Sequence, residues 1–359
     1  MRSSPRPTLR DVARRASISM MSVSRVINNS GYASPELRAK VERAIRELNY
    51  VPNRAAKVLA TNQLSRNVAI LFDAPGAAAL EEMIAAGYPE AGLSQVQLAF
   101  IKVRAFDDPA GACATITELG IRGAILSPPL CDDLRLRARL AKAGIRSVAI
   151  ACGDPNSPIS TIGIDDWRAA HALTNHLVEL GHRRIAFVAG DPRNRAFARR
   201  RAGYEAALLE HGLEPEPVLP RKDCGGSRAA AIAAEQALGS PTRPSAIVAA
   251  DEEAAAAVVG AATDRGVVIP HGLSLCAFCD IGGPPVSQRL TKVTQPMGLM
   301  ASWGIRQLAE ELSAVEQGNR PDIRRVLFDH DFHLGDSVAP PEQAETGHRV
   351  AASWGGMRE

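Results

Sequence analysis

The sequence predicts an α/β protein in which a small all-helical head precedes a larger body of parallel sheets. Over most of the 359 residues, short runs of β-branched and aromatic residues alternate with Ala-, Leu- and Arg-rich stretches at helical spacing. Such alternation is typical of parallel sheets with helices on both faces. Before residue 67 the pattern differs, because three short amphipathic helical stretches follow one another without a strand candidate.

The charge is divided at the same point of the chain. Residues 1–66 contain 13 Lys and Arg against four Asp and Glu, a formal charge of +9. The remainder contains 29 against 35, a formal charge of −6. A basic head on an acidic body is typical of a polyanion-binding module attached to a unit with a second function.

Composition narrows the class of protein. The sequence has no run of 18 or more apolar residues, so we expect no transmembrane helix and no membrane partner. It shows no apolar segment typical of a signal peptide, so we expect a cytoplasmic location with the six scattered cysteines reduced. Cys276 and Cys279 are three apart on a predicted strand and should point to opposite faces, which argues against a metal or redox pair. We expect no metal and no cofactor.

Three helix starts are visible in the head. Thr8 followed by Asp11 is a capping-box pattern, Ser19 can cap a second helix, and Ser34-Pro35 suits the start of a third. The first two helices flank a tight polar turn, and the second exposes small polar residues and one arginine. This is the plan of a helix-turn-helix, whose second helix lies in the DNA major groove.

A short hinge helix is predicted after the head. The segment 50–53 breaks the third helix, and residues 53–60 then form a helix-competent stretch with nothing of its own to pack against. An isolated helix of about eight residues is marginal in water. We therefore expect it to form only when a partner chain or DNA supports it.

The body is expected to hold two doubly wound parallel sheets with a cleft between them, because some 270 residues of this pattern exceed one sheet. Strands are predicted at 68–72, 96–101, 123–127, 146–151, 184–189, 245–250 and 273–279. Helices are predicted at 110–119, 132–143, 166–180, 197–211, 227–238, 251–265 and 297–316. Ligands of such folds bind at the carboxyl ends of strands.

Four body residues are cleft candidates from their positions alone. Asp73 ends the first body strand and is a plausible polar contact for a ligand. Phe72, Phe197 and Phe278 are candidates to line the cleft, although packing in the core is the alternative for each.

Several ordered motifs carry a resemblance to a known family. They are Leu9-x-Asp-Val-Ala13, Ser19-x-x-Ser-Val-Ser-Arg-Val-Ile-Asn28, Tyr50-Val-Pro-Asn53, Asn53-Arg-Ala-Ala-x-x-Leu-Ala60, Gly181-His-Arg-Arg-Ile-Ala-Phe-Val-Ala-Gly190, Arg200-x-x-Gly-Tyr204 and Leu290-Thr-x-Val-x-Gln-Pro296. Together they resemble the lactose-repressor/galactose-repressor (LacI/GalR) transcription factors over residues 8 to about 340.

The resemblance implies a dimeric regulator whose body is of periplasmic-binding-protein type, with three chain crossings near 164, 294 and 325. The expected divisions are a helix-turn-helix domain (1–52), a hinge helix and linker (53–66), an effector-binding and dimerisation domain (67–340) and a disordered tail (341–359). Within the effector-binding domain, subdomain one would be 67–164 plus 295–325, and subdomain two 165–294 plus 326–340.

The resemblance also assigns roles in the head. Met20, Met21 and Arg25 would read bases, with arginine bonding guanine and methionine contacting thymine methyls; core packing is the alternative for the methionines. Leu59 would enter the minor groove as an apolar wedge, with a simple linker leucine as the alternative. Ser17 stands where the family usually has glycine. The other residues assigned to DNA, for which capping and turn structure is the alternative at several positions, are Thr8, Ser19, Ser22, Ser24, Asn28, Tyr32, Asn53 and Ala56.

In the body, Arg200 matches the family's ligand-clamping arginine; a surface charge is the alternative. Ala250 and Cys279 stand where sugar-binding members have Asn and Asp, and Cys224-Gly225 replaces an aromatic residue. Sugars need several convergent polar groups. The effector-binding set is therefore expected to include Ala250 and Cys279 but to suit a carbohydrate less well; a less polar ligand and a weakened pocket both stay open.

The favoured function is a ligand-responsive transcriptional repressor that binds a pseudo-palindromic operator as a homodimer. A solute-binding protein or an enzyme on the same scaffold is the alternative. The basic head argues against the first, and no recognisable catalytic constellation supports the second. An activator, or a regulator whose DNA affinity rises with ligand, stays open.

Overall fold

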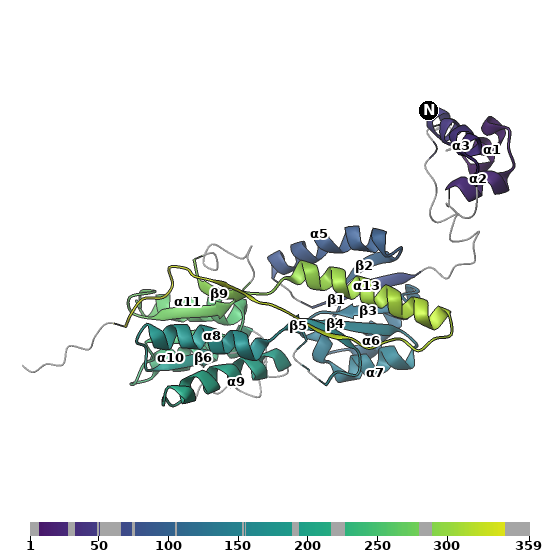
Figure 1. Ribbon diagram of the computed structural model, residues 1–359. Coiled ribbons are helices and arrows are strands. Elements are labelled where there is room, and N and C mark those ends of the chain that lie inside the picture. The colour runs from purple at the N-terminus through teal and green to yellow at the C-terminus, as the bar shows by residue number, and fades with distance from the viewer. Residues whose placement is uncertain are drawn as a thin grey trace, which may run out of the picture. The chain divides into compact units, whose positions relative to one another are not determined.

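The computed structural model divides into two compact units, residues 1–65 and 66–359, which are described separately (Figure 1). The structure describes residues 7–27, 33–48, 50, 66–73, 76–104, 106–152, 154, 156–188, 194–216, 227–279 and 289–341, with side chains at all of these except 227 and 229.

The described part of the head consists of three helices, α1 (Leu9–Ala16), α2 (Met20–Ile27) and α3 (Pro35–Leu48). One apolar face of each helix meets the others in a small core made of Val12, Ala13, Val23, Val26, Val41 and Ala44. The expected caps are present. Thr8 and Asp11 bond reciprocally, Ser19 Oγ accepts from Ser22 N at 3.1 Å, and Ser34 Oγ accepts from Leu37 N at 3.2 Å. The three predicted helices are therefore confirmed.

The turn between α1 and α2 forces Ser17 into the left-handed region, with φ 57° and ψ 43°. A Cβ atom in this region costs about 1–2 kcal/mol, which glycine avoids. We expect Ser17→Gly to raise the stability of the head by about 1 kcal/mol. Hydrogen exchange of the amides in α1 to α3, measured in the full chain, reports this directly. Ser17→Ala keeps the Cβ and is the control, and equal protection in the two variants would contradict the explanation.

Within the described residues, the first sheet of the body has six parallel strands in the order β10-β5-β4-β3-β1-β2. These are β1 (Asn67–Phe72), β2 (Gln97–Lys102), β3 (Gly123–Leu126), β4 (Arg146–Ile150), β5 (Ser160–Ile164) and β10 (Arg325–Phe328). Helices α5 (Ala77–Leu93) and α13 (Met297–Glu316) pack on one face, whose core includes Ile70, Met83 and Leu308. Helices α6 (Pro109–Glu118) and α7 (Leu134–Lys142), with the short helix η1 (Leu130–Asp132), cover the other.

The second sheet has five strands among the described residues, in the order β11-β9-β8-β7-β6. They are β6 (Ile185–Val188), β7 (Ala246–Ala249), β8 (Ser274–Phe278), β9 (Thr291–Thr294) and β11 (Asp331–His333). Only β11 runs antiparallel to its neighbour. Helices α8 (Asp166–Glu179) and α9 (Arg195–Glu210) pack on one face, and α10 (Ser227–Gly239) and α11 (Glu252–Asp264) pack on the other (Figure 1).

The chain passes between the sheets three times, after β5, after β9 and after β10. The last passage differs from the expectation. The boundary placed at 325 falls on the first residue of β10, which pairs with β5 in the first sheet. The crossing lies instead between Phe328 and Asp331, because the strand pairing continues to the end of β10.

Cys276 and Cys279 do lie on opposite faces of the second sheet. Cys276 belongs to the core under α8 and α9, and Cys279 to the core under α10 and α11. The described chain then ends against this sheet, since Ala339 N donates to Ser274 Oγ at 3.0 Å. The tail predicted from residue 341 lies outside the described residues except for Pro341.

Candidate functional site

Helix α2 presents an exposed face with an unusual pair of methionines. Met20 and Met21 are 48% and 72% exposed, and Arg25 is also exposed, whereas Val23 and Val26 fill the core. The core-packing alternative for the methionines is therefore wrong. Apolar surface at the start of the second helix of a helix-turn-helix lies where base edges are contacted.

The serines around this face also serve as local caps. Ser19 Oγ accepts from Ser22 N, and the Ser19 and Ser22 hydroxyls lie 2.9 Å apart. One hydroxyl donates to the other, so one proton of the pair remains for an outside acceptor such as a phosphate oxygen. The Thr8 hydroxyl donates to Asp11 Oδ2 at 2.6 Å, so its proton is used within the capping box. Ser24 is half-buried on α2.

Five residues assigned to DNA and one cleft position lie outside the described residues. They are Asn28, Tyr32, Asn53, Ala56, Leu59 and Cys224.

In the body, Arg200 on α9 is buried at the carboxyl ends of the strands of the second sheet. Its Nε donates to Asp166 Oδ1 at 2.7 Å, and its Nη1 donates to the carbonyl oxygen of Ala250. Its guanidinium carbon lies 3.9 Å from the ring centroid of Phe278. Arg200 is 5% exposed, so the surface-charge alternative is wrong. Among the described residues Nη2 makes no hydrogen bond.

Burial raises the pKa of the acidic groups near Arg200. Burial raises the pKa of Asp166, and Arg200 opposes that shift. Asp251 caps α11, with Oδ1 accepting from Ala254 N at 2.7 Å, and burial raises its pKa as well. Burial, Asp251 and Asp73 raise the pKa of Glu253. Asp73 directly follows β1, so the residue after the carboxyl end of a strand in the first sheet influences a carboxyl group on α11 of the second.

The remaining cleft candidates differ in burial and in the sheet to which they belong. Phe72 and Asp73 are half-buried at the end of β1. Phe197 and Phe278 belong to the core on the α8–α9 side of the second sheet, and Phe278 additionally supports Arg200. Cys279 packs on the α10–α11 side of this sheet.

Sequence reasoning missed two partners at this junction. Asp165 caps α8, and the next residue, Asp166, is the ion-pair partner of Arg200. Arg195, the first residue of α9, donates from its N to Asp132 Oδ2 at 2.9 Å, and its Nη1 lies 2.9 Å from Asp154 Oδ2. Aspartates that follow strand ends were the available signal, but their partners are distant in sequence.

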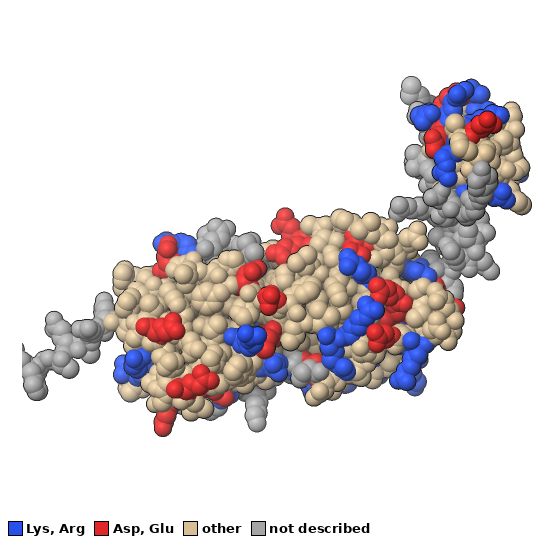
Figure 2. Space-filling view, in the orientation of Figure 1, with Lys and Arg blue, Asp and Glu red and all other residues tan. Residues whose placement is uncertain are grey.

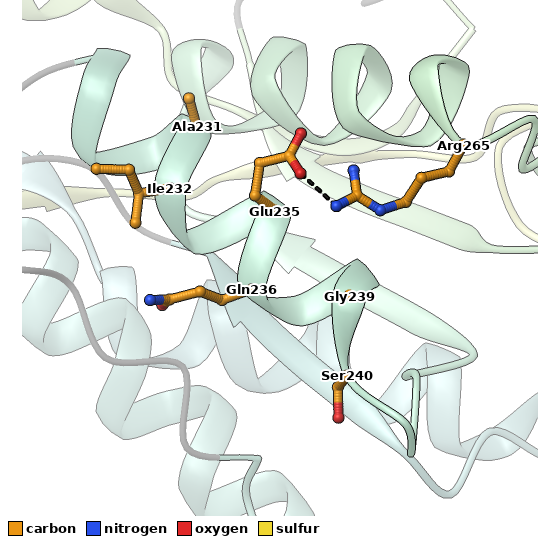
Figure 3. Close-up of a pocket in the computed structure, with 7 residues that line it drawn as sticks. All are labelled: Ala231, Ile232, Glu235, Gln236, Gly239, Ser240 and Arg265. Carbon is orange, nitrogen blue, oxygen red and sulfur yellow. Dashed lines mark ion pairs between the residues drawn. The ribbon is translucent and has the colours of Figure 1, made fainter.

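Two surface hollows lie elsewhere. The larger, about 530 Å³, lies between the C-terminal ends of α10 and α11 and is spanned by the Glu235–Arg265 ion pair (Figure 3). These helix ends lead into the amino ends of β7 and β8, opposite to the strand ends where ligands of such folds bind. The smaller, about 350 Å³, lies where α5 and the start of α13 meet the segment after β9. Neither contains Arg200.

Comparison with known proteins agrees with this architecture. Residues 8–53 match "Bacterial regulatory proteins, lacI family", and residues 174–338 match "Periplasmic binding protein-like domain". The chain is 30% identical to the HTH-type transcriptional regulator CelR of Thermobifida fusca, over 90% of this chain and 96% of that protein. It is 26% identical to the lactose operon repressor of Escherichia coli K12, over 96% of this chain and 95% of that protein.

Solved structures give the same fold. The lac repressor dimer bound to operator and the anti-inducer ONPF superposes with a TM-score of 0.72 at 24% identity, covering 93% of this chain and 100% of that one. The CelR–cellobiose complex gives a TM-score of 0.65 at 25% identity, covering 92% of this chain and 100% of that one.

A helix-turn-helix head followed by a two-sheet body with a buried arginine at the strand ends defines a DNA-binding transcriptional regulator with a ligand-binding type of domain. The chain belongs to the LacI family of these regulators. None of the helices in the described ranges combines the length and apolar character needed to span a bilayer.

Proposed function

We propose that this regulator represses transcription by binding a pseudo-palindromic operator as a homodimer, and that a carbohydrate or related metabolite bound in the body changes its DNA affinity. The exposed face of Met20, Met21 and Arg25 on a basic unit carries the proposal. We assign it no catalytic role, and a regulator that acts on DNA would work in the cytoplasm. The lactose operon repressor and the cellobiose-bound CelR are relatives consistent with this function.

Charge on the head supports DNA binding. Lys and Arg side chains gather on the visible face of the head (Figure 2). Affinity should fall steeply with salt, because each neutralised phosphate releases counterions. Binding selection from genomic fragments with the purified protein would supply an operator, and an affinity independent of salt would argue strongly against the proposal.

Arg25 is expected to contribute sequence discrimination as well as affinity. A bidentate contact to guanine is worth about 1–3 kcal/mol, so Arg25→Ala should weaken binding to the selected operator about 10- to 100-fold. Binding to a scrambled duplex should change much less. The matched control is Arg14→Ala on α1, an arginine with a 75% exposed side chain, which should weaken both duplexes alike. Fluorescence anisotropy with the two duplexes separates these outcomes; equal losses for Arg25→Ala on both would refute base reading.

The body supports recognition of an oxygen-rich ligand. A guanidinium already fixed by Asp166, Ala250 and Phe278 offers its remaining Nη2 without a large ordering cost. A thermal-shift screen of sugars, sugar acids, nucleosides and aromatic glycosides tests this, since a ligand of the folded body raises its melting temperature. A hit should also change operator affinity. Ligands that bind without any effect on DNA would leave the chain a binding protein rather than an effector-controlled repressor.

Self-association is supported by exposed apolar residues on neighbouring helices. Ile84, Tyr88 and Leu93 on α5 are 38%, 55% and 80% exposed, and Leu299 on α13 is 63% exposed. Helices α5 and α13 are in contact, since Gly298 N donates to Glu82 Oε2 at 3.3 Å. A surface of this kind is typical of a protein–protein interface. Sedimentation velocity of the full chain would show the dimer.

A further inference from the structure

Two cysteines and an aspartate come together where β3 and β4 end. Cys131 and Asp132 belong to the short helix η1 after β3, and Cys152 follows β4. One ligand atom from each, the two Sγ atoms and a carboxylate oxygen, all lie within 4.8 Å of one another. Neither cysteine is in a disulfide.

The fold builds this cluster from its backbone. Strands β3 and β4 are neighbours and parallel, so their carboxyl ends lie side by side. Ala151 has φ 49°, which interrupts the alternation of faces after β4. Ile150 and Ala151 both pack in the core on the α5–α13 side, and Cys152 then packs on the α6–α7 side, where Cys131 is buried.

The two sulfurs are close together and differ in burial. Their Sγ atoms lie within 4.8 Å of each other. Cys131 is fully buried and Cys152 half-buried. The pair therefore has one buried cysteine and one that is partly exposed.

Asp132 adds an unsatisfied oxygen. It is 7% exposed, its Oδ2 accepts from Arg195 N, and its Oδ1 is buried without a hydrogen-bond partner among the described residues. A buried carboxylate oxygen without a partner is unfavourable and calls for a cation or a donor. The nearby cations Arg137 and Arg195 are held by Asp154, at 3.9 and 2.9 Å.

We propose that Cys131, Cys152 and Asp132 bind one thiophilic divalent cation of the zinc type. Two thiolates and one carboxylate are a ligand set that zinc accepts, with water in the fourth tetrahedral position. Binding displaces the two thiol protons to solvent, so that two S–H bonds are replaced by two metal–sulfur bonds without any change of oxidation state.

The position of the site gives the cation a structural consequence. Asp132 Oδ1 would bind the cation while Oδ2 still accepts from the first residue of α9, which packs on the second sheet. A bound cation keeps this carboxyl ionised, so that Oδ2 remains an acceptor for Arg195 N. The cation would therefore tie the first sheet to α9 at the junction of the two subdomains.

Cobalt(II) titration of the reduced, metal-free full chain tests the site. We expect uptake of about one equivalent with a thiolate-to-cobalt charge-transfer band, which zinc then displaces. Cys131→Ser and Cys152→Ser should each weaken or abolish the band, and Asp132→Asn should weaken cobalt binding. The matched control is Cys113→Ser, a half-buried free thiol of the same subdomain, which should leave the titration unchanged.

A second measurement does not depend on the variants folding. In the wild-type chain, zinc should slow alkylation of Cys152 by a maleimide and leave Cys113 unaffected. The absence of a charge-transfer band in the reduced chain would overturn the proposal, as would a titration unchanged by replacing both Cys131 and Cys152. The proposal would also be overturned if Cys131 and Cys152 form a disulfide on oxidation but bind no metal after reduction. Operator binding is measured separately, so failure here leaves the repressor proposal standing.

Discussion

Arg200→Leu is expected to lower the free energy of unfolding of the body by about 3–5 kcal/mol, because it strands the carboxylate of Asp166. Asp166 is 3% exposed, and its Oδ1 accepts from Arg200 Nε at 2.7 Å. The same change removes the donor to the Ala250 carbonyl and the cation above Phe278. We also expect the variant to lose any ligand-induced rise in melting temperature, since Nη2 is gone.

Urea unfolding followed by tryptophan fluorescence measures the loss, and Arg199→Leu is the matched control. Arg199 lies next in sequence and pairs with Asp165 at 3.3 Å, but its side chain is 39% exposed, so we expect about 1 kcal/mol or less. The double variant Arg200→Leu/Asp166→Leu should recover much of the stability, because it removes the unpaired charge. A double variant no more stable than Arg200→Leu would show that packing, not charge, is responsible.

The loss of unfolding free energy caused by Arg200→Leu should be smaller in mild acid than at neutral pH. Burial raises the folded-state pKa of Asp166 above its ordinary 3.8, and loss of Arg200 raises it further. A raised carboxyl pKa means that the folded state holds the proton, so stability is retained in acid and lost as pH rises through the folded-state value. The deficit relative to wild type should therefore be smaller in mild acid than at neutral pH. A deficit that grows in acid would contradict this assignment.

Gly203→Ala is the second large effect that we expect. A Cβ at this position in α9 would lie 2.1 Å from the carbonyl oxygen of Trp167 and 3.1 Å from His171 N. Both contacts are backbone atoms of α8, which no side-chain rotation can move away. Helices α8 and α9 would have to separate, at a cost of about 3 kcal/mol or more.

Gly260→Ala is the matched control for Gly203→Ala. Gly260 is an exposed glycine inside α11, and no heavy atom lies within 4 Å of the Cβ position. There the substitution should stabilise the chain by about 0.5–1 kcal/mol, since alanine loses less entropy in a helix. Thermal unfolding of the two variants compares the effects directly. Similar melting temperatures of the two variants would show that α8 and α9 can separate at a lower cost than their close backbone contact indicates.

The helices and strands that the sequence reveals are those with a clear local signal. The strand at Ala246–Ala249 is a continuous apolar run, but β5 (Ser160–Ile164) and β9 (Thr291–Thr294) mix apolar residues with Ser, Thr, Gly and Lys and were not predicted. Strands β10 and β11 are short, partly exposed edge strands whose pairing is decided by distant segments. Helix α5 was missed too; it contains Pro89, which on sequence grounds favours a break.

The site was predictable to a similar, limited degree. The motif around Arg200 identified the buried arginine, and the helix-turn-helix pattern identified the exposed Met20 and Met21. Asp166 was not identified as a site residue, because its partner Arg200 is 34 residues away. Cys131 and Cys152 have no spacing that suggests a pair, and only the adjacent ends of β3 and β4 bring them together.

The late position of β10 and β11 has a consequence for synthesis of the protein. The nine residues 325–333 supply the last edge strand to both sheets. A chain emerging from the ribosome therefore has both halves of its body unfinished until this stretch is free, although most of each sheet is already made. Premature stop codons anywhere before it would leave two open sheet edges at once, and such edges are prone to aggregation.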